Sequence, residues 1–371
     1  MSLQIEILII GMMAAVACSL LGVFLVLKKM SMMSDAITHT ILLGIVLVFF
    51  ITKDLNSPWL IAGASLMGVL SVYLIESLQR TKLLSEEASI GVVFPFIFSI
   101  AILLITYYAG SVHLDTDSVL LGELSFAPFD RATYFGISLP RSLVSMAIIL
   151  SINVVFIKVF FKELKLSSFD PLLSAILGFS PVLIHYGLMT LISITAVGAF
   201  NVVGSILVIS FMIGPPITAS LLTHDLKKLI AYSSTIAMFN AFFGFLLAFG
   251  LDVSISGSMA VITGLTFMLV FLFAPKEGYI SLINLRQKQK IEFEKIMILF
   301  HLFNHENDKD YDEECGVDTL YHHLNWKKEL VSKHVQSLEE NNLIAINGEI
   351  IHLTEKGRQE SSNYYQSIFE K

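Results

Sequence analysis

The segment Ile5–Leu27 reads IEILIIGMMAAVACSLLGVFLVL, and Lys28 and Lys29 follow it directly. Its 23 residues are enough to cross the hydrocarbon core of a bilayer as an α-helix, which takes about 20 apolar residues. A secretory signal peptide would begin with basic residues and have a shorter apolar run, and no Lys or Arg precedes this one. We therefore predict a helix that is retained in the membrane.

Apolar runs of similar length continue along the chain as far as residue 274. They predict an all-α polytopic membrane protein with eight or nine transmembrane helices. The count depends on the runs at 182–197 and 200–222, because only Gly198 and Ala199 separate them. The candidate spans lie at about 5–27, 36–51, 59–79, 88–108, 141–161, 182–197, 200–222, 229–250 and 256–274.

Charged residues divide the chain into two parts. Of residues 1–280, 28 are charged, whereas 27 of residues 281–371 are. A soluble domain carries about 25% charged residues, so the first part suits a bilayer and the second part suits water. We predict three regions: a transmembrane domain at 1–278, a linker at 279–290 and a cytoplasmic domain at 291–371.

Basic residues near the ends of the spans indicate the orientation, because cytoplasmic loops are enriched in Lys and Arg. With nine spans and the N-terminus outside, every strongly basic loop falls on the cytoplasmic side, and so does the C-terminal domain. The charge pattern therefore predicts a multi-pass membrane protein with its N-terminus outside. The basic loops contain Lys28 and Lys29, Arg80 and Lys82, Lys158, Lys162 and Lys165, and Lys227 and Lys228.

Two ionisable residues, Asp35 and His39, lie at the start of the second span. Their spacing of four places both on one helical face. A carboxylate and an imidazole suit Zn²⁺, Mn²⁺ or Fe²⁺. Two ligands do not close a site, so a transient pathway site or a symmetric copy from a second subunit would be needed. The alternative is an Asp at the membrane surface and a His that is satisfied within the core.

Other polar residues of the membrane part allow several interpretations. In an outward loop, His113, Asp115 and Asp117 could pass on a cation, or one of the aspartates could cap a short helix. Glu76 and His185 lie near span ends and are interpreted as interfacial. No Walker A loop, GxSxG elbow or HExxH motif occurs, so the chain is not predicted to be an enzyme. An ATP-driven transporter would need its ATPase on another chain.

Four stretches of the membrane part follow one another in a specific order. They are LKKMSMMSDAITHTILLG at 27–44, EEASIG at 86–91, FDPLLSAILG at 169–178, and AVGAFNVVG at 196–204, which runs on to GPPITASLLT at 214–223. In this order and spacing, residues 1–275 resemble an ABC-transporter permease of the zinc, manganese and iron uptake family.

The resemblance implies a permease with no permanently bound cofactor, which transports Mn²⁺, Zn²⁺ or Fe²⁺. It implies a second permease copy (identical or a paralogue), cytoplasmic ABC ATPase subunits and an extracytoplasmic metal-binding protein. The family's Asp-x-x-x-His ligand pair falls on Asp35 and His39. Its ATPase-coupling segment falls on 169–180, for which an ordinary surface helix is the alternative. The coupling residues would be Phe169, Asp170, Pro171, Ala175 and Gly178, where Asp170-Pro171 predicts a helix start and Gly178 its end.

The C-terminal part predicts a small α+β domain. Helical patterns at 291–304, 317–324 and 326–342 are followed by a hairpin at 343–353 and a helix from Thr354. A charged loop is expected at 307–314, and Asn347-Gly348 is expected at the hairpin turn. This order is typical of a winged helix-turn-helix. The segment Leu353–Arg358 resembles the end of the wing in iron-dependent-repressor-type regulators.

The role of this domain stays open, because fold does not imply function. DNA contacts would come from the third helix, but a net charge of −5 over residues 281–371 argues against DNA as a partner. The histidines and the acidic loop of this domain could form a metal sensor, or they could be a solvated loop with surface histidines. We favour a regulatory or dimerising domain. The candidate DNA contacts are Lys327, Lys328, Lys333 and His334. The candidate sensor residues are His301, His305, Cys315, His322 and His323, together with the acidic loop at 307–314.

Three functions account for the whole pattern to different degrees. A metal-importer permease explains the spans, the Asp35–His39 pair and the resemblance together. A membrane-tethered, metal-responsive DNA-binding regulator would need fewer spans. A proton-coupled secondary transporter would favour inverted repeats, and none is visible. Cys18 and Cys315 fall in different parts of the chain and support no disulfide framework.

Overall fold

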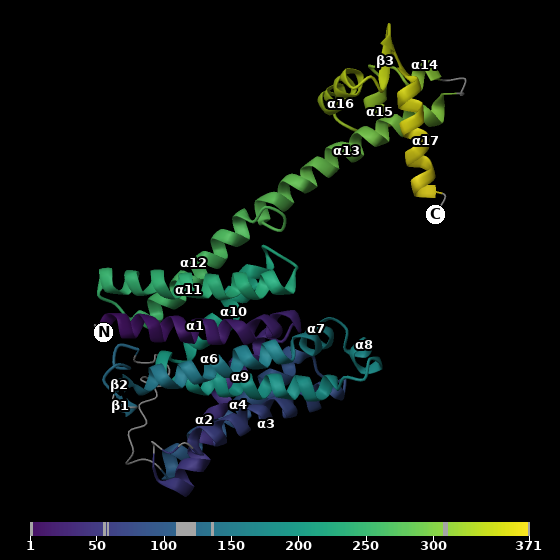
Figure 1. The fold of residues 1–371 in the computed structure, drawn as a ribbon. Coiled ribbons are helices and arrows are strands. Elements are labelled where there is room, and N and C mark those ends of the chain that lie inside the picture. Colours follow the sequence, from purple (N-terminus) through teal and green to yellow (C-terminus); the bar gives the residue numbers. More distant parts are fainter. Residues whose placement is uncertain are drawn as a thin grey trace. The chain divides into compact units, whose positions relative to one another are not determined.

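Two units make up the chain: a membrane unit, Met1–Gly278, and a C-terminal unit, Tyr279–Lys371. The computed structural model describes residues 3–54, 57, 59–108, 124–134, 137–306 and 311–369. The membrane unit is helical apart from one short hairpin (Figure 1). Its elements are α1 (Leu3–Leu27), α2 (Ser31–Thr52), α3 (Trp59–Arg80), α4 (Glu86–Tyr108), β1 (Arg131–Tyr134), β2 (Ile137–Pro140), α6 (Arg141–Val159), α7 (Phe161–Phe169), α8 (Pro171–Ile176), α9 (Pro181–Val203), α10 (Ser205–Ser220), α11 (Leu226–Leu251) and α12 (Ile255–Phe273).

The lengths of these helices confirm a multi-pass membrane protein. Among the described residues, 8 helices are long and apolar enough to cross a bilayer, and α10 is a shorter apolar helix of 16 residues. The prediction of eight or nine spans agrees with this set. The predicted boundary at Gly198-Ala199 is wrong, because Gly198 lies inside α9 and the break occurs at Gly204. Gly204 has φ +82°, a conformation that a residue with a side chain rarely adopts.

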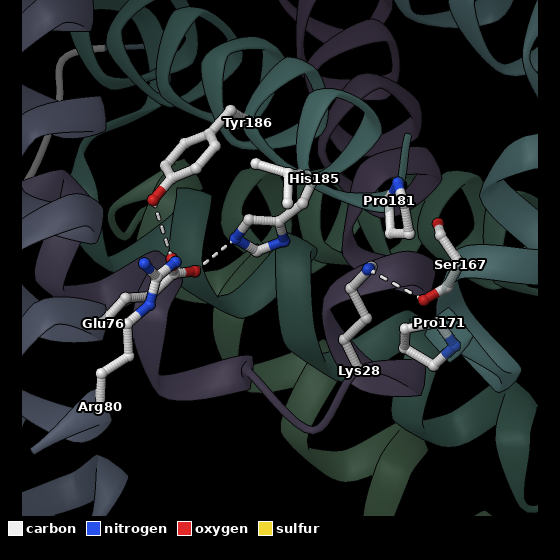
Figure 2. A pocket seen from close by; sticks show the side chains of 9 residues that line it. Lys28, Glu76, Arg80, Ser167, Pro171, Pro181, His185 and Tyr186 are labelled. Atoms are coloured by element: carbon white, nitrogen blue, oxygen red, sulfur yellow. Dashed lines mark hydrogen bonds and ion pairs between the residues drawn. The ribbon is translucent and has the colours of Figure 1, made fainter. Parts of the chain in front are cut away.

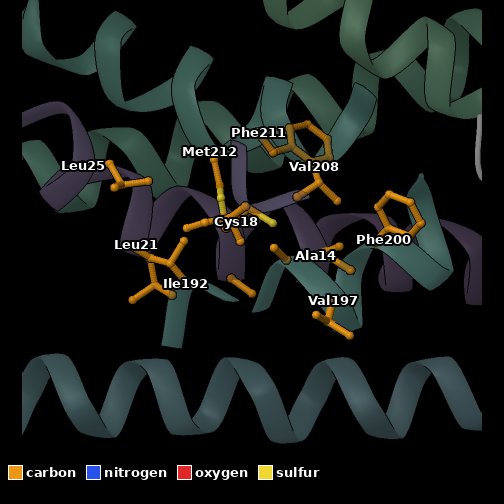
Figure 3. Close-up of a cluster of buried hydrophobic side chains, with 14 of the residues drawn as sticks. Ala14, Cys18, Leu21, Leu25, Ile192, Val197, Phe200, Val208, Phe211 and Met212 are labelled. Carbon is orange, nitrogen blue, oxygen red and sulfur yellow. The ribbon is translucent and has the colours of Figure 1, made fainter. Parts of the chain in front are cut away.

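Helix α1 runs through the centre of the membrane unit. Its side chains pack against α9 and α10 in a continuous apolar core (Figure 3). Backbones approach closely at glycines: a Cβ on Gly22 of α1 would lie 1.9 Å from the Met212 carbonyl oxygen of α10. A Cβ on Gly44 of α2 would lie 2.3 Å from the Gly63 carbonyl oxygen of α3. Small residues at such crossings are typical of helix packing within membranes.

The two ends of the membrane unit carry different elements. The N-terminus and the β1–β2 hairpin lie at one end of the bundle, and α7 and α8 lie at the other (Figure 1). The hairpin is tied to α1 by an ion pair in which Arg131 Nη1 lies 2.9 Å from Glu6 Oε2. The Glu6 side chain is only 5% exposed, so the pair holds a buried carboxylate.

The C-terminal unit consists of α13 (Tyr279–His305), α14 (Tyr311–Glu314), α15 (Leu320–His323), α16 (Lys328–Glu340), the antiparallel strands β3 (Ile344–Asn347) and β4 (Ile350–Leu353), and α17 (Glu355–Phe369). Its core lies between α13, α16 and the hairpin and includes Ile298, Leu302, Val335 and Ile351. The element order therefore follows the predicted helices, hairpin and final helix.

Residues 279–290, predicted as a linker, form the first part of helix α13. Two local predictions in this unit are wrong. Residues 311–314, predicted as loop, form the short helix α14. The hairpin turn is centred on Gly348 and Glu349, because Asn347 pairs with Ile350, and Gly348 supplies the positive φ of +68°. A turn of this kind needs glycine at its first central position, which explains the one-residue shift.

Candidate functional site

Asp35 and His39 lie one turn apart on α2 and face the same side, as their spacing predicts. Asp35 Oδ1 lies 3.4 Å from His39 Nε2. Two donors bound at about 2.1 Å to one tetrahedral ion are about 3.4 Å apart, so the pair already has a spacing suited to metal ligation. The Asp35 side chain is 44% exposed and that of His39 is 22% exposed, so both remain accessible within a single chain.

The surroundings of the pair fix one side of the imidazole. The His39 ring packs against two phenylalanines of α4, with ring centroids 5.1 Å from Phe94 and 5.8 Å from Phe98. On another side of α2, the Thr40 hydroxyl donates to Ser71 Oγ of α3 at 3.0 Å. These contacts orient α2 between its neighbours, and among the described residues this point offers two donors, Asp35 and His39. The outer-loop candidates His113, Asp115 and Asp117 lie outside the described residues.

The segment 169–180 folds as predicted, with a helix that begins at Pro171. The Asp170 side chain accepts a hydrogen bond from the Leu173 amide at 2.9 Å and caps this short helix, α8. Beyond its end, Gly178 has φ +87°. Phe169, Asp170, Pro171, Ala175 and Gly178 are all exposed. Large apolar side chains beside them are exposed as well, namely Leu172, Leu173, Ile176 and Leu177.

A pocket of about 240 Å³ lies next to α8 and is lined by polar groups from four parts of the chain (Figure 2). Glu76 of α3 is its centre: one carboxylate oxygen lies 2.5 Å from His185 Nε2, and the other accepts from the Tyr186 hydroxyl at 2.9 Å. Arg80 approaches the same carboxylate at 3.8 Å. Lys28 Nζ donates to the Ser167 carbonyl oxygen at 3.3 Å, and burial lowers the pKa of this lysine.

The Glu76–His185 contact goes beyond what the sequence predicts. Both residues were interpreted as interfacial, and the two side chains are indeed partly buried near span ends, at 15% and 14% exposure. They are separated by 109 residues, so nothing in the sequence spacing indicates that they meet. The only sequence signal is that a carboxylate and an imidazole occur within apolar spans, where ionisable groups are costly.

In the C-terminal unit, the predicted sensor residues divide into two groups. The side chains of His301, His305 and Glu314 lie with ligand atoms within 4.8 Å of one another, and His323 Nδ1 lies 2.9 Å from Glu314 Oε2. Cys315, by contrast, is completely buried in the hydrophobic core, and His322 is exposed and stacks on Tyr321. Of the predicted sensor residues, His301, His305 and Glu314 of the acidic loop therefore lie together, His323 contacts Glu314, and Cys315 and His322 lie elsewhere.

The predicted DNA contacts on α16 differ in their accessibility. Lys327, Lys328 and Lys333 are exposed. Lys328 forms an ion pair with Asp318 at 2.8 Å. His334 points inward: its side chain is 3% exposed and bonds Glu294 Oε2 at 2.8 Å, so it is not available to a phosphate or base.

Comparisons with known proteins identify relatives of both units. The sequence profile of the ABC 3 transport family matches residues 2–274. The zinc transport system membrane protein TroD of Treponema pallidum is 42% identical over 355 residues, covering 96% of this chain and 97% of that protein. That coverage includes most of the C-terminal unit.

Two further similarities cover about three quarters of the chain. The manganese transport system membrane protein MntD of Bacillus subtilis is 41% identical, covering 76% of this chain and 95% of MntD. The solved structure of PsaBC from Streptococcus pneumoniae in complex with Fab has a TM-score of 0.62 and 27% identity, covering 76% of this chain and 95% of that chain. The chain therefore belongs to the ABC 3 transport family, as a multi-pass permease.

Proposed function

We propose that this chain is the permease subunit of an ATP-driven importer of Mn²⁺ or Zn²⁺, and that Asp35 and His39 are ligands on the metal pathway. The observation that carries the proposal is the 3.4 Å spacing of these two side chains on α2, within a chain whose residues 2–274 match the family profile. Relatives named for zinc and for manganese transport support these two ions. Fe²⁺ suits the same donors and is a third ion to test.

A second permease copy completes the site in this proposal. One chain supplies one carboxylate and one imidazole, and the partly exposed Asp35 belongs to a helix that is long enough to span the bilayer. Ionisable residues in such helices face a bundle interior or a water-filled cavity, or pair with one another. Two facing copies would bring two Asp–His pairs together and supply four donors for the transported ion.

ATP hydrolysis and metal delivery would come from other proteins. The exposed apolar side chains around α8 suit docking in a groove of a cytoplasmic ATPase subunit, so the end of the bundle with α7 and α8 would be cytoplasmic. The opposite end, with the N-terminus and the β1–β2 hairpin, would then face an extracytoplasmic metal-binding protein. The C-terminal unit follows α12 and would be cytoplasmic, which agrees with the distribution of Lys and Arg.

Uptake of labelled ions by cells that lack this chain tests the proposal. Complementation with the wild-type chain should restore accumulation of Mn²⁺ or Zn²⁺, and the competition among Mn²⁺, Zn²⁺ and Fe²⁺ will identify the ion. Asp35→Asn combined with His39→Gln should abolish accumulation, because both donors lose their ligand character with little change in volume. Wild-type accumulation by the double variant would refute the site.

A control within the same helical turn separates ligation from packing. Thr38 lies between the two ligands, and its hydroxyl donates to the Asp35 carbonyl oxygen within the helix at 2.8 Å. Thr38→Val removes a polar group there without removing a charged donor and should leave accumulation close to wild type. Equal amounts of each variant in the membrane must be verified first.

For the C-terminal unit we propose a winged-helix fold with a regulatory role. The order of helices, the β3–β4 hairpin and the following α17 support the fold. DNA binding is the alternative, favoured only by exposed Lys327 and Lys333 on α16. A Lys327→Gln and Lys333→Gln variant distinguishes them: a DNA contact predicts loss of salt-dependent DNA retention, whereas a regulatory unit predicts no DNA retention by the wild type.

A further inference from the structure

Four metal-ligand side chains meet in the C-terminal unit, on three different helices. His301 and His305 are one turn apart on α13, with ring centroids 4.6 Å from each other. Glu314 ends α14, and His323 ends α15, with its ring 6.0 Å from that of His301. Helices separated in the sequence therefore direct three imidazoles and one carboxylate to the same place.

Glu314 approaches two of the histidines, and His301 Nε2 also lies 3.1 Å from the Glu314 backbone carbonyl oxygen. Glu314 Oε2 lies 2.9 Å from His323 Nδ1 and 3.8 Å from His301 Nε2. These values bracket the separation of about 3.4 Å between two ligands of a tetrahedral ion. His301, His305 and Glu314 each offer a ligand atom within 4.8 Å of the other two, and His323 joins this group through Glu314.

The four side chains differ in their exposure to solvent. The His301 side chain is 13% exposed, whereas that of His323 is 34% exposed. The cluster thus has a buried side and an open side, through which an ion can enter.

We propose that His301, His305, His323 and Glu314 form a binding site for a divalent transition-metal ion, with Zn²⁺ bound more tightly than Mn²⁺. Three nitrogen donors and one carboxylate oxygen match the ligands of four-coordinate zinc, and an N-rich site follows the order Mn²⁺ below Zn²⁺ in affinity. An ion bound there would connect α13 to α14 and α15. That the site meets ions brought in by the same chain rests on the proposed function, but binding itself does not.

The test is metal binding by the full-length chain in detergent. Asp35→Ala and His39→Ala are introduced first, so that the pair on α2 cannot contribute. Equilibrium dialysis against Zn²⁺ should then show one tightly held ion per chain. Changing His323 or Glu314 to Gln should weaken this binding by at least about tenfold, since altering only the outer shell of a metal site costs about 10- to 100-fold.

His322→Gln is the matched control, because His322 is adjacent to His323 and exposed, and its ring contacts Tyr321. It should retain wild-type affinity. Co²⁺ gives a second readout: four-coordinate Co²⁺ has intense visible absorption, which Glu314→Gln should change while His322→Gln does not. No bound Zn²⁺ in the background variant, or equal losses for His322→Gln and His323→Gln, would overturn the proposal.

These outcomes are independent of transport. If the chain takes up no metal in cells but the Co²⁺ spectrum depends on His323 and Glu314, the proposed function fails and this site remains. If uptake depends on Asp35 and His39 but the background variant holds no ion, the site fails and the proposed function remains. A change of circular dichroism in the Gln variants would identify misfolding, and His305→Gln then provides the replacement variant.

Discussion

Replacing Gly22 by Ala should destabilise the membrane unit through the contact between α1 and α10. The new Cβ would lie 1.9 Å from the Met212 carbonyl oxygen and 2.8 Å from its carbonyl carbon. Non-bonded atoms are most stable about 3.5 Å apart, so the two backbones would have to separate by about 1.5 Å. A backbone atom cannot rotate aside as a side chain can. The change therefore moves one of two packed helices.

The expected cost can be derived from opposing contributions. Overpacking a core costs about 1–3 kcal/mol, and the upper part of this range applies when backbone must move. Alanine has a higher helix propensity than glycine by about 1 kcal/mol, which offsets part of the loss. A net loss of about 1–2 kcal/mol corresponds to a midpoint of thermal unfolding lower by about 2–4 °C for a unit of this size.

Heating the purified chain in detergent, followed by size-exclusion chromatography, measures this loss. Gly264→Ala in α12 is the control, because a Cβ there meets no atom within 4 Å and only the gain in helix propensity remains. Gly91→Ala in α4 has the same open surroundings and provides a second control. The reasoning is refuted if Gly22→Ala has a midpoint equal to, or above, those of the two controls.

Three further changes test other contacts. Burial lowers the folded-state pKa of His301 below its ordinary value of 6.5, so the unfolded chain binds more protons near this pH. The metal-free C-terminal unit should therefore lose stability as pH falls below 6.5. Denaturant titrations at several pH values check this, and His301→Gln should weaken the pH dependence. Arg131→Gln should lower the free energy of unfolding by about 1–2 kcal/mol more than Glu6→Gln does. The first change leaves the buried Glu6 carboxylate without its partner, whereas the second leaves an arginine that is partly exposed to solvent. Asp170→Ala removes the cap of α8, worth about 1 kcal/mol, and should reduce co-purification of the proposed ATPase while Zn²⁺ binding by the C-terminal unit stays unchanged.

The parts of the fold that follow from local pattern were predictable. Apolar length predicts the spans, and the spacing of four predicts that Asp35 and His39 share a face, because both properties depend only on the geometry of a single helix. Likewise, the Asp170-Pro171 dipeptide predicts the start of α8, since Asp accepts from an amide of the first turn and Pro needs no hydrogen bond there. The C-terminal helices and hairpin follow from periodicity in the same way.

Features that depend on contact between distant segments were not predictable. Both Gly198 and Gly204 lie in apolar sequence, and only packing selects between them: at Gly198 a Cβ would meet the Ile149 side chain at 2.3 Å, so this glycine serves helix packing within α9. Similarly, Glu314 and Cys315 are adjacent in the sequence, but their side chains lie in different surroundings. The thiol takes the core position, as an apolar group does, and the carboxylate then faces the histidines.

Helix α7, which leads into α8, is connected to the segment that bears the proposed metal ligands, because the Ser167 carbonyl oxygen of α7 accepts a hydrogen bond from Lys28 in the turn before α2. Helix α9, which follows α8, contacts α3 through His185, Tyr186 and Glu76. Further along α3, Ser71 accepts a hydrogen bond from Thr40, the residue after His39. Chains of hydrogen bonds and packed side chains of this kind can carry energetic coupling between distant sites. In the proposed complex, a displacement of α8 by an ATPase would be passed to α7 and α9, and from them towards α2. In the proposed dimer, this displacement would alter the distance between the two Asp35–His39 pairs, and so release the ion, without any contact between nucleotide and metal.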